Sequence, residues 1–420
     1  MSLLITNIGQ LVSMAGPSLR RGEQMGIVDF YRDAAIYIEG SKLIAVGPRV
    51  DVERLAKEDC EIINAGNGVV TPGLVDAHTH AVFAGSRAKE FEMRCQGATY
   101  ESIAASGGGI RSTVEAVRGS TKENLLAESL RNVRTMIRCG TTTAEIKTGY
   151  GLSVETEMLM LQTAIKVGKH TGVTVSPTFL GAHAVPPEFS KRADDYITYL
   201  IEEVLPAIAN LKIAHSADAF CESLAFNKDQ VRRYAEAAQN YGLAIRLHVD
   251  QLSDSGGATF AAKLRAKTAD HLEYTGTVGI KALFHAGTMP VLLPGSVYGL
   301  GHKTYPQARA MIHADLPVVL ATDFNPGSSP TPSLPMVMSL ACTQMKMTPG
   351  EALSACTVNA AASLDLEDSK GRLEPGMDAD VVIWDCSDWR EIIQFFGNEM
   401  ARIVIAGGQK IFQRADSQIW

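Results

Sequence analysis

The stretch Pro72-Gly73-Leu74-Val75-Asp76-Ala77-His78-Thr79-His80 begins as a short apolar run and ends in two histidines. This pattern predicts a strand over Leu74–His80. Side chains of a strand alternate between its two faces, so we expect His78 and His80 to project together from its carboxyl end. Two imidazoles on one rigid strand can bind a divalent metal ion. The pattern is weak evidence alone, and its meaning depends on the rest of the chain.

Seven further runs resemble buried strands, and helical segments separate them. The predicted strands are Thr141–Lys147, Val173–His183, Ala217–Cys221, Leu243–Val249, Ala269–Tyr274, Met289–Leu293 and Val318–Thr322. The predicted helices include Lys122–Arg138, Glu155–Gly168, Ala193–Ala209 and Asp229–Tyr241. Repeated strand–helix alternation predicts a parallel sheet with right-handed crossovers. Eight units within residues 71–364 predict an α/β fold, a (β/α)8 barrel of the TIM type. A doubly wound open sheet is the competing architecture, but its dinucleotide fingerprint is missing.

The two ends of the chain have a different texture, with short β-rich runs and turns. The predicted strands are Leu3–Ile8, Ala34–Glu39, Lys42–Gly47, Glu61–Asn64, Ala379–Asp385 and Arg402–Ala406. Turn residues such as Glu39-Gly40-Ser41 separate them. We therefore expect residues 1–70 and 365–420 to form one small β-sandwich domain, and residues 71–364 to form the barrel.

Composition excludes several classes of partner. The 420 residues are 46% hydrophobic and 20% charged, with a formal net charge of −7, and no run of Lys or Arg predicts a nucleic acid or a membrane surface as partner. A small anionic substrate remains compatible, because one local arginine can bind it. The N-terminus lacks a signal-peptide pattern, and no apolar stretch reaches the roughly 18 residues of a membrane span. We expect a cytoplasmic protein.

The cysteines predict no disulfide framework. There are seven, an odd number, and no two have the CxxC spacing. This usage in a long chain favours reduced, mostly buried thiols over disulfides or a thiolate metal site.

Polar residues follow the predicted barrel strands where barrel enzymes place their reacting groups. His248 ends the fifth strand, His271 lies in the sixth and Asp323 closes the eighth. With the first-strand pair, these residues predict one divalent metal ion bound by His78, His80, His248 and Asp323, with His271 beside it. The remaining histidines, at positions 170, 215, 285, 302 and 313, are interpreted as structural or solvated.

Structural interpretations remain open for each of these side chains. The three proposed histidine ligands can also be satisfied core residues. His271 can pair with Asp270, its neighbour in the chain. Asp323 can be a helix N-cap or a turn residue.

The first-strand stretch resembles the corresponding motif of the amidohydrolase superfamily. Other stretches resemble, more narrowly, the branch of that superfamily that opens a cyclic amide in histidine degradation. They are Phe83–Arg87, Gln96–Tyr100, Gly107–Thr113, Glu145–Leu152, Phe179–His183, Ala269–Glu273 and Ala321–Pro330. Such matches run from about residue 70 to 385. The resemblance implies 4-imidazolone-5-propanoate as substrate, N-formimino-L-glutamate as product, Zn²⁺ or Fe²⁺ as the metal, and a homodimer.

The resemblance also implies catalytic roles. A bound metal lowers the pKa of its water from ~9 towards ~7, which supplies a nucleophile at neutral pH. Asp323 is the first candidate to carry the proton to the departing nitrogen, and His271 is the second. Protonated His271 can also stabilise the oxyanion. Some relatives have a glutamate where this chain has Gln251, which cannot accept a proton, so we expect a hydrogen-bonding role for Gln251.

The propanoate tail of such a substrate calls for a cation. Arg87 can make a bidentate carboxylate contact. By resemblance, Tyr150, His183, Asn325, Gly327 and Ser328 also contact substrate or product. Structural alternatives exist for three of them: Arg87 can be an ordinary surface arginine, Tyr150 a packed aromatic ring, and His183 a hydrogen-bonded imidazole at a strand end. The Gly107–Gly109 loop either cradles an anion at a helix start or is a flexible connector.

Two rival functions remain. A deaminase acting on an amino-heterocycle is the nearer one, but such enzymes tend to keep the acid that Gln251 replaces and need no arginine for a propanoate. A non-catalytic scaffold on the same fold is the other, and the presence of all four ligands disfavours it.

Overall fold

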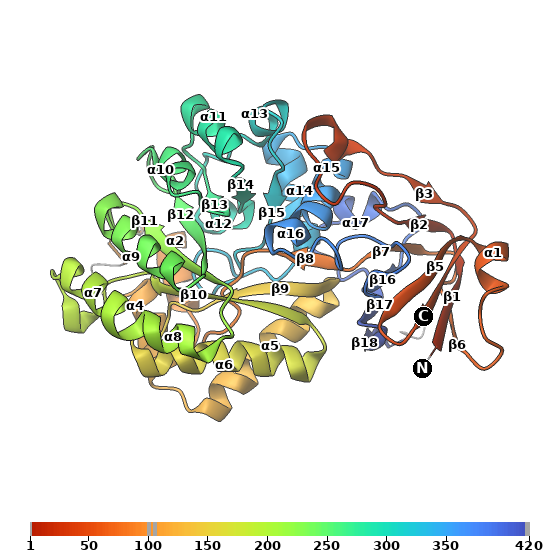
Figure 1. Ribbon diagram of the computed structural model, residues 1–420, viewed down its shortest axis with the longest axis horizontal. Coiled ribbons are helices and arrows are strands. Elements are labelled where there is room, and N and C mark those ends of the chain that lie inside the picture. Colours follow the sequence, from red (N-terminus) through yellow and green to blue (C-terminus); the bar gives the residue numbers. More distant parts are fainter. Residues whose placement is uncertain (1, 99–101, 104–106, 416–420) are drawn as a thin grey trace.

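The computed structural model describes residues 2–98, 102–103 and 107–415, and an eight-stranded parallel sheet forms its centre (Figure 1). The strands are β8 (Leu74–Asp76), β9 (Thr141–Lys147), β10 (Thr174–Ala182), β11 (Ser216–Cys221), β12 (Ala244–Val249), β13 (Thr268–His271), β14 (Met289–Leu292) and β15 (Val319–Leu320). Each strand pairs in parallel with the next one in the chain. This order is that of a (β/α)8 barrel, so the fold prediction is confirmed and the doubly wound alternative is wrong.

The barrel is completed where the first and last strands run on beyond their regular ladders. The amide of Asp323 donates to the carbonyl of His78, and the amide of His80 donates to the carbonyl of Phe324, both at 3.0 Å. The only bridge at this seam among the described residues joins Thr79 to Phe324. The first strand therefore ends at Asp76 and not, as predicted, at His80. Three proposed metal ligands lie on the seam itself.

Three of the four predicted helices agree closely with the structure, because their first turns are capped. They are α5 (Lys122–Arg138), α6 (Val154–Thr171) and α9 (Lys228–Asn240), which follow Thr121, Ser153 and Asn227, and each cap side chain accepts a backbone N–H of the first turn. The fourth is interrupted: α7 (Ala193–Tyr199), the π-helical turn η3 (Leu200–Val204) and α8 (Leu205–Leu211) follow one another directly. Pro206 lacks an N–H, which explains the irregular turn before it.

The other helices connect or flank the strands. They are α1 (Arg49–Glu53), α2 (Ala88–Cys95), α4 (Ile110–Arg118), α10 (Gly257–Lys263), α11 (Thr277–Ala286), α12 (Pro294–Leu300), α13 (Ala308–His313), α14 (Leu334–Met345), α15 (Pro349–Ala355), α16 (Val358–Ser363) and α17 (Glu391–Gln394), with 3-10 turns η1 (Gly22–Gly26) and η2 (Pro187–Phe189). No helix among the described residues is long and apolar enough to span a bilayer. All seven cysteines are free, but only Cys139, Cys221 and Cys356 are buried, fewer than predicted.

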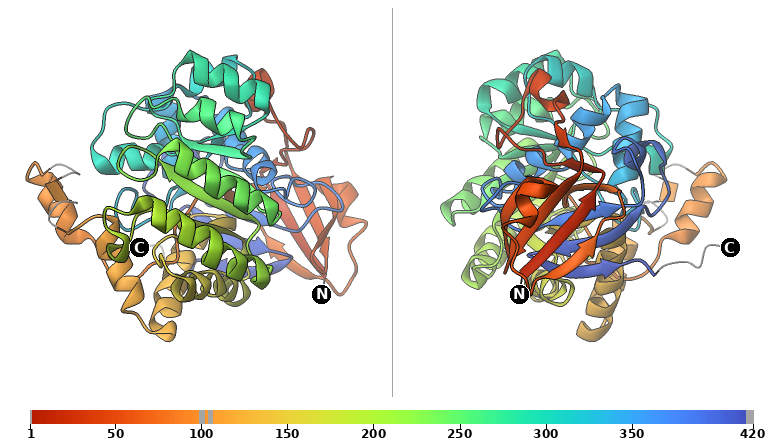
Figure 2. Two further views of the ribbon diagram at one scale, coloured as in Figure 1. Left: turned by 60° about the vertical axis from the view of Figure 1, so that its left-hand side comes forward. Right: turned by 90° about the vertical axis from the view of Figure 1, so that its right-hand side faces the viewer.

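Both chain ends contribute strands to two further sheets (Figures 1 and 2). One has the order β5 (Lys42–Pro48), β4 (Ala34–Glu39), β1 (Ser2–Ile8), β6 (Glu61–Asn64). The other has the order β18 (Gln409–Gln413), β17 (Ala401–Ala406), β16 (Val381–Trp384), β7 (Val69–Pro72), β2 (Gln10–Val12), β3 (Phe30–Tyr31). The predicted sheets from the chain ends are thus present, while β2, β3, β7 and β18 were not predicted.

The six-stranded sheet is covered on both faces. On β16, Val381 and Ile383 belong to an aliphatic core shared with the four-stranded sheet, whereas Val382 and Trp384 pack into the barrel core. This explains the continuous apolar run in β16, because alternate side chains enter two different cores.

Part of the N-terminal segment lies against the barrel. Arg20 donates its amide to the side chain of Asn359, and Ser354 donates its hydroxyl to the carbonyl of Met25. The division into residues 1–70 plus 365–420 and residues 71–364 stays a prediction.

Candidate active site

The structure brings the five predicted metal-site residues together at the carboxyl end of the barrel. His78 Nε2 and His80 Nε2 lie 3.6 and 3.5 Å from the same oxygen of Asp323. The ring of His248 lies 4.5 Å from that of His78 and 5.3 Å from that of His271, between centroids. Two groups have ligand atoms within 4.8 Å of one another, and His78 belongs to both. They are His78, His80 and Asp323, and His78, His248 and His271.

Hydrogen bonds on the far side of two rings orient them. His78 Nδ1 lies 2.6 Å from Asp270 Oδ2, and His248 Nδ1 lies 3.0 Å from Asp218 Oδ1. In each ring Nδ1–H therefore donates to a carboxylate, and Nε2 carries the lone pair. Both Nε2 atoms are buried and have no hydrogen-bond partner among the described residues. Buried imidazole lone pairs backed by carboxylates form the donor set that a divalent metal such as Zn²⁺ or Fe²⁺ prefers.

A buried lysine joins the two supporting carboxylates. Lys147 Nζ lies 2.7 Å from Asp218, 2.9 Å from Glu145 and 3.5 Å from Asp270. Burial opposes its charge, but these carboxylates together hold the pKa of Lys147 above its ordinary value. Burial also opposes ionisation of Asp218, whereas His248 and Lys147 bring its pKa well below the usual range. The network therefore keeps charged groups paired beneath the site.

Sequence reasoning missed this network. Its members are Glu145, Lys147, Asp218, Arg246 and Asp270, all buried. A signal for them was present, because charged residues inside apolar parallel strands are unusual and demand partners. Which charged residues pair with one another depends on which strands are neighbours, so the pairs could not be predicted from the sequence.

His271 does not pair with Asp270, because Asp270 accepts from His78. Instead, His271 Nδ1 lies 3.3 Å from Glu273 Oε1. Burial lowers the pKa of His271, but the Glu273 carboxylate outweighs it and leaves that pKa raised. The backbones of His271 and Asp323 have φ of 82° and 53°, a region that non-glycine residues adopt rarely and often at functional sites.

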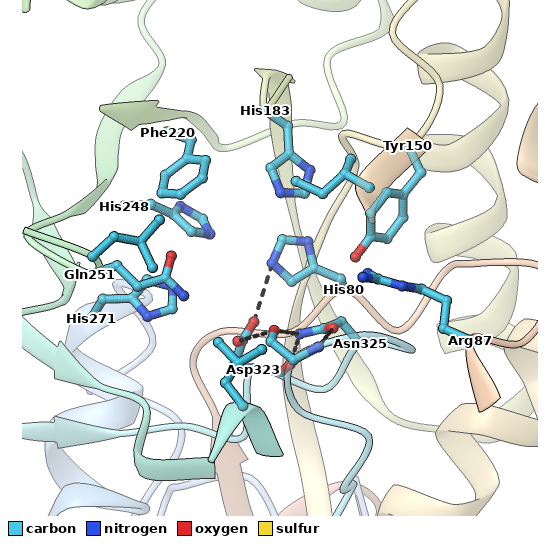
Figure 3. A pocket seen from close by; sticks show the side chains of 14 residues that line it. His80, Arg87, Tyr150, His183, Phe220, His248, Gln251, His271, Asp323 and Asn325 are labelled. Atoms are coloured by element: carbon cyan, nitrogen blue, oxygen red, sulfur yellow. Dashed lines mark hydrogen bonds and ion pairs between the residues drawn. The ribbon is translucent and has the colours of Figure 1, made fainter. Parts of the chain in front are cut away.

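A cavity opens above the cluster, and Figure 3 shows its side chains pointing inward from several strands. Its lining is His80, Arg87, Ile110, Tyr150, His183, Phe220, His248, Gln251, Leu252, His271, Leu300, Asp323, Asn325 and Ser328. Of the predicted site residues, His78 lies beneath this lining and Gly327 lies beside Arg87. The apolar residues Ile110, Phe220, Leu252 and Leu300 were not predicted, since a single hydrophobic residue gives no distinguishing signal.

Two aromatic side chains form one wall. His183 Nδ1 lies 3.0 Å from the carbonyl of Gly149, so Nδ1–H donates and Nε2 is an acceptor. Burial, reinforced by His248, lowers the pKa of His183 to about 3. The His183 ring stacks on His80 at 5.3 Å, and Tyr150 lies 5.4 Å from His183. His183 is thus a neutral acceptor at physiological pH.

The turn after β15 organises Asp323. The side-chain amide of Asn325 donates from Nδ2 to the backbone carbonyl of Asp323 at 2.6 Å, and its Oδ1 accepts from the backbone amides of Gly327 and Ser328. Ser328 Oγ lies 3.3 Å from Asp323 Oδ2. Asn325 and Ser328 therefore support Asp323 as well as line the cavity.

The Gln251 loop and Arg87 are both held in place. Next to Gln251, the Asp250 carboxylate accepts from two backbone amides and from the hydroxyls of Ser255 and Thr275. Arg87 is an ion-pair partner of Glu90, and its side chain is only 8% exposed. It is therefore not an ordinary surface arginine.

Comparisons with known proteins agree with this geometry. The model of the amidohydrolase family matches residues 69–410. Similar proteins include imidazolonepropionases of Solibacter usitatus (49% identity; 98% of this chain and 99% of the relative), Rubrobacter xylanophilus (47%; 97% and 98%) and Shewanella loihica (44%; 91% and 93%).

Solved structures with the same fold include E. coli guanine deaminase, with a TM-score of 0.73 at 13% identity over 99% of this chain and 100% of that one. A triazine hydrolase variant has a TM-score of 0.74 at 16% identity over 98% and 95%. These two likenesses show the fold alone. The family match and the extent of the sequence identity show that the chain belongs to the amidohydrolase family.

Proposed function

We propose that the protein opens the ring of 4-imidazolone-5-propanoate by hydrolysing its cyclic amide, which yields N-formimino-L-glutamate. Relatives named imidazolonepropionase, 42–49% identical over most of the chain, support this proposal. The observation that carries it is a single cavity that holds the histidine–aspartate cluster and Arg87 together. Such a cavity suits a molecule with a reactive carbonyl at one end and a carboxylate at the other.

His78, His80, His248 and Asp323 would hold one divalent metal ion, Zn²⁺ or Fe²⁺. When bound, it would polarise the ring carbonyl and lower the pKa of a coordinated water. Nε2 of His78 and Nε2 of His248 have no hydrogen-bond partner in the part of the chain that the structure describes, and this observation supports these ligands.

The chain's own residues then direct the proton and the ring. Asp323 accepts a proton from the attacking water and passes it to the ring nitrogen as the carbonyl–nitrogen bond breaks. His271, held by Glu273, faces the same space and donates a hydrogen bond to the oxygen that becomes negative. His183 Nε2 accepts a hydrogen bond from a ring N–H, while Gln251 hydrogen-bonds without acting as a base.

Binding of the tail falls to Arg87, with Tyr150, Asn325, Ser328 and Gly327 nearby. The apolar side chains of the lining limit the access of bulk water to the reacting groups. The expected homodimer and cytoplasmic location stay predictions.

The test is hydrolysis of 4-imidazolone-5-propanoate by the purified protein, followed by loss of ring absorbance together with an ammonia assay. We expect absorbance to fall without ammonia release. Ammonia release from an amino-heterocycle, with no loss of the imidazolone, would instead indicate a deaminase. A protein without bound metal and without either activity would indicate a scaffold.

Two variants separate metal binding from tail binding. His248→Ala should lose metal and at least about 10³-fold in kcat/KM, because the metal supplies several kcal/mol to the reaction. Arg87→Ala should keep its metal and show a KM raised about 10- to 100-fold, since one charged hydrogen-bonded contact is lost. A parental KM in Arg87→Ala would show that the tail binds elsewhere.

A further inference from the structure

Glu90, which the mechanism above does not use, holds Arg87 from behind the cavity. Arg87 Nε donates to Glu90 Oε2 at 2.8 Å, and Nη2 lies 2.7 Å from the same oxygen. Glu90 itself does not line the cavity, whereas Arg87 does. Figure 3 shows the guanidinium directed into the cavity between Tyr150 and His80.

The second oxygen of Glu90 is bound by a different segment. Gly109 N donates to Oε1 at 3.1 Å, and Ser112 Oγ donates to it at 2.9 Å. Gly109 precedes α4 and has φ of 78°, which favours glycine. The start of this helix therefore does bind an anion, and the anion is the chain's own carboxylate.

The two oxygens of the Glu90 carboxylate therefore have different roles. One oxygen accepts from the arginine, and the other ties α2 to the start of α4. Burial raises the pKa of Glu90, but Arg87, Ser112 and Gly109 outweigh it and leave that pKa below its ordinary value. Glu90 is thus an ionised, fully bonded group with no capacity left for a ligand of its own.

The opposite side of the guanidinium is bounded by bare backbone. A Cβ added at Gly327 would lie 1.9 Å from Arg87 Nη1, so any side chain there would displace the guanidinium. The Gly327 carbonyl accepts from Arg94 Nη2 at 3.2 Å, which fixes this backbone in turn. Arg87 is therefore confined between a carboxylate and a glycine.

We propose that Glu90 is a positioning residue that holds Arg87 in the orientation required to bind the substrate's carboxylate, with Gly327 as the opposing wall. The inference rests on the proposed function. A guanidinium has five N–H donors. Glu90 accepts the Nε donor and forms an ion pair with Nη2, and donors on the two terminal nitrogens remain for a ligand. A tethered arginine loses less side-chain entropy when it binds, and the donors already point at the tail.

Steady-state kinetics with 4-imidazolone-5-propanoate test the proposal. Glu90→Ala should raise KM about tenfold, and Glu90→Gln less, because its amide keeps one acceptor. Gly327→Ala, which disturbs Arg87 from the other side, should also raise KM. In the two Glu90 variants, kcat should stay within about twofold of the parent and the metal content should be unchanged, because the tail is remote from the reacting bond. The matched control is Glu128→Gln, whose carboxylate accepts from Gly85 N nearby without touching Arg87. It should keep the parental KM.

A double-mutant cycle separates positioning from a merely structural role. If Glu90 acts through Arg87, then Glu90→Gln adds nothing to the KM of Arg87→Ala. If Glu90→Gln raised KM in the Arg87→Ala background by as much as it does in the parent, the proposal would be overturned. So would a KM below the parental value in Glu90→Ala, since Glu90 would then compete with the substrate for Arg87. Should Glu90→Ala fail to fold, Glu90→Gln and Gly327→Ala still decide the outcome.

Propanoate as a probe distinguishes failure of this inference from failure of the proposed function. Calorimetric titration of the metal-loaded protein with propanoate requires no turnover. We expect binding by the parent, and binding weakened by about tenfold in Glu90→Ala. If the parent bound propanoate but did not open the ring of 4-imidazolone-5-propanoate, only the proposed function would be contradicted. Ring opening with an unchanged KM and unchanged propanoate affinity in Glu90→Ala would contradict the inference alone.

Discussion

The barrel centre and the core between the two end sheets are both sealed from solvent, yet they contain opposite kinds of side chain. Beneath the histidines lie five charged groups, Glu145, Lys147, Asp218, Arg246 and Asp270. Between the end sheets the core is aliphatic apart from one methionine, and it includes Leu3, Ile36, Val381 and Ile383. The charged groups of the barrel centre orient the proposed metal ligands, while the core between the end sheets stabilises the fold by burying apolar surface.

The difference shows how stability and function are divided between regions. Replacing a buried ion network with apolar side chains is often neutral or stabilising, so such a network is poor evidence of a stability gain. Here it fixes two imidazole rings through Asp270 and Asp218. The aliphatic core has no such constraint and stabilises in proportion to the apolar area it buries. Substitutions in the two interiors should therefore have separable effects.

The largest effect on stability is expected from Lys147→Met. Removing the cation leaves buried carboxylates without their partner, which costs about 3–5 kcal/mol. Urea unfolding of the metal-free protein measures this loss. Lys57→Met, which breaks the exposed pair with Glu39, is the control and should lower the stability far less.

The pH dependence of that loss follows from the raised pKa of Lys147. A lysine with a folded-state pKa above its ordinary 10.5 contributes stability that is fully present below that value and lost only at higher pH. The difference between parent and Lys147→Met should thus be constant between about pH 7 and 9. A difference that disappears within this range would show that Lys147 is not charged in the folded protein.

A smaller effect, and one confined to stability, is expected from Ile383→Ala. This side chain is fully buried between the end sheets, and its truncation should cost about 3 kcal/mol. The affinity for metal should not change, because the residue contacts no part of the barrel centre. Ile62→Ala, at a position 64% exposed on β6, should change stability by less than about 0.5 kcal/mol. Weakened metal binding in Ile383→Ala would show that the two interiors are coupled.

Asp218→Asn should weaken metal binding, the effect that Ile383→Ala should not have. The amide keeps the size of the side chain but removes the charge that supports His248 and pairs with Lys147. Loss of such an outer carboxylate lowers metal affinity by about 10- to 100-fold. Titration with a competing chelator measures this. Asp229→Asn, an exposed aspartate of α9, is the control and should retain the parental affinity.

The smallest effect is expected at a charge pair outside both interiors. Arg390 donates to Asp388 and lowers its pKa to about 2. A depressed carboxyl pKa contributes stability above its ordinary value near 4 and loses it as the pH falls towards 2. Solvent screening limits the contribution to less than about 0.5 kcal/mol. Melting temperatures of Asp388→Asn and the parent should differ slightly at pH 6, and the difference should shrink as the pH falls through 2.

The site illustrates how far the sequence leads. His78, His80, His248, His271 and Asp323 were predicted to converge because each ends or follows an apolar run, and parallel strands of a barrel present their carboxyl ends at one face. Arg87 was proposed from the charge of the implied substrate. The hydrogen-bond partner of each side chain was harder to predict. Asp270 was considered as the partner of His271, but it accepts from His78 instead.

The sequence by itself determined the number and order of the strand–helix units, the separate β-rich ends and the residue types available at the barrel mouth, because these depend on local periodicity and composition. Only the tertiary structure decided the seam between the first and last strands, the pairing of Lys147 with its carboxylates and the tether from Glu90 to Arg87. Such contacts join groups on separate strands or loops, and local periodicity carries no record of which distant groups meet. Their distances and burial are properties of the folded chain.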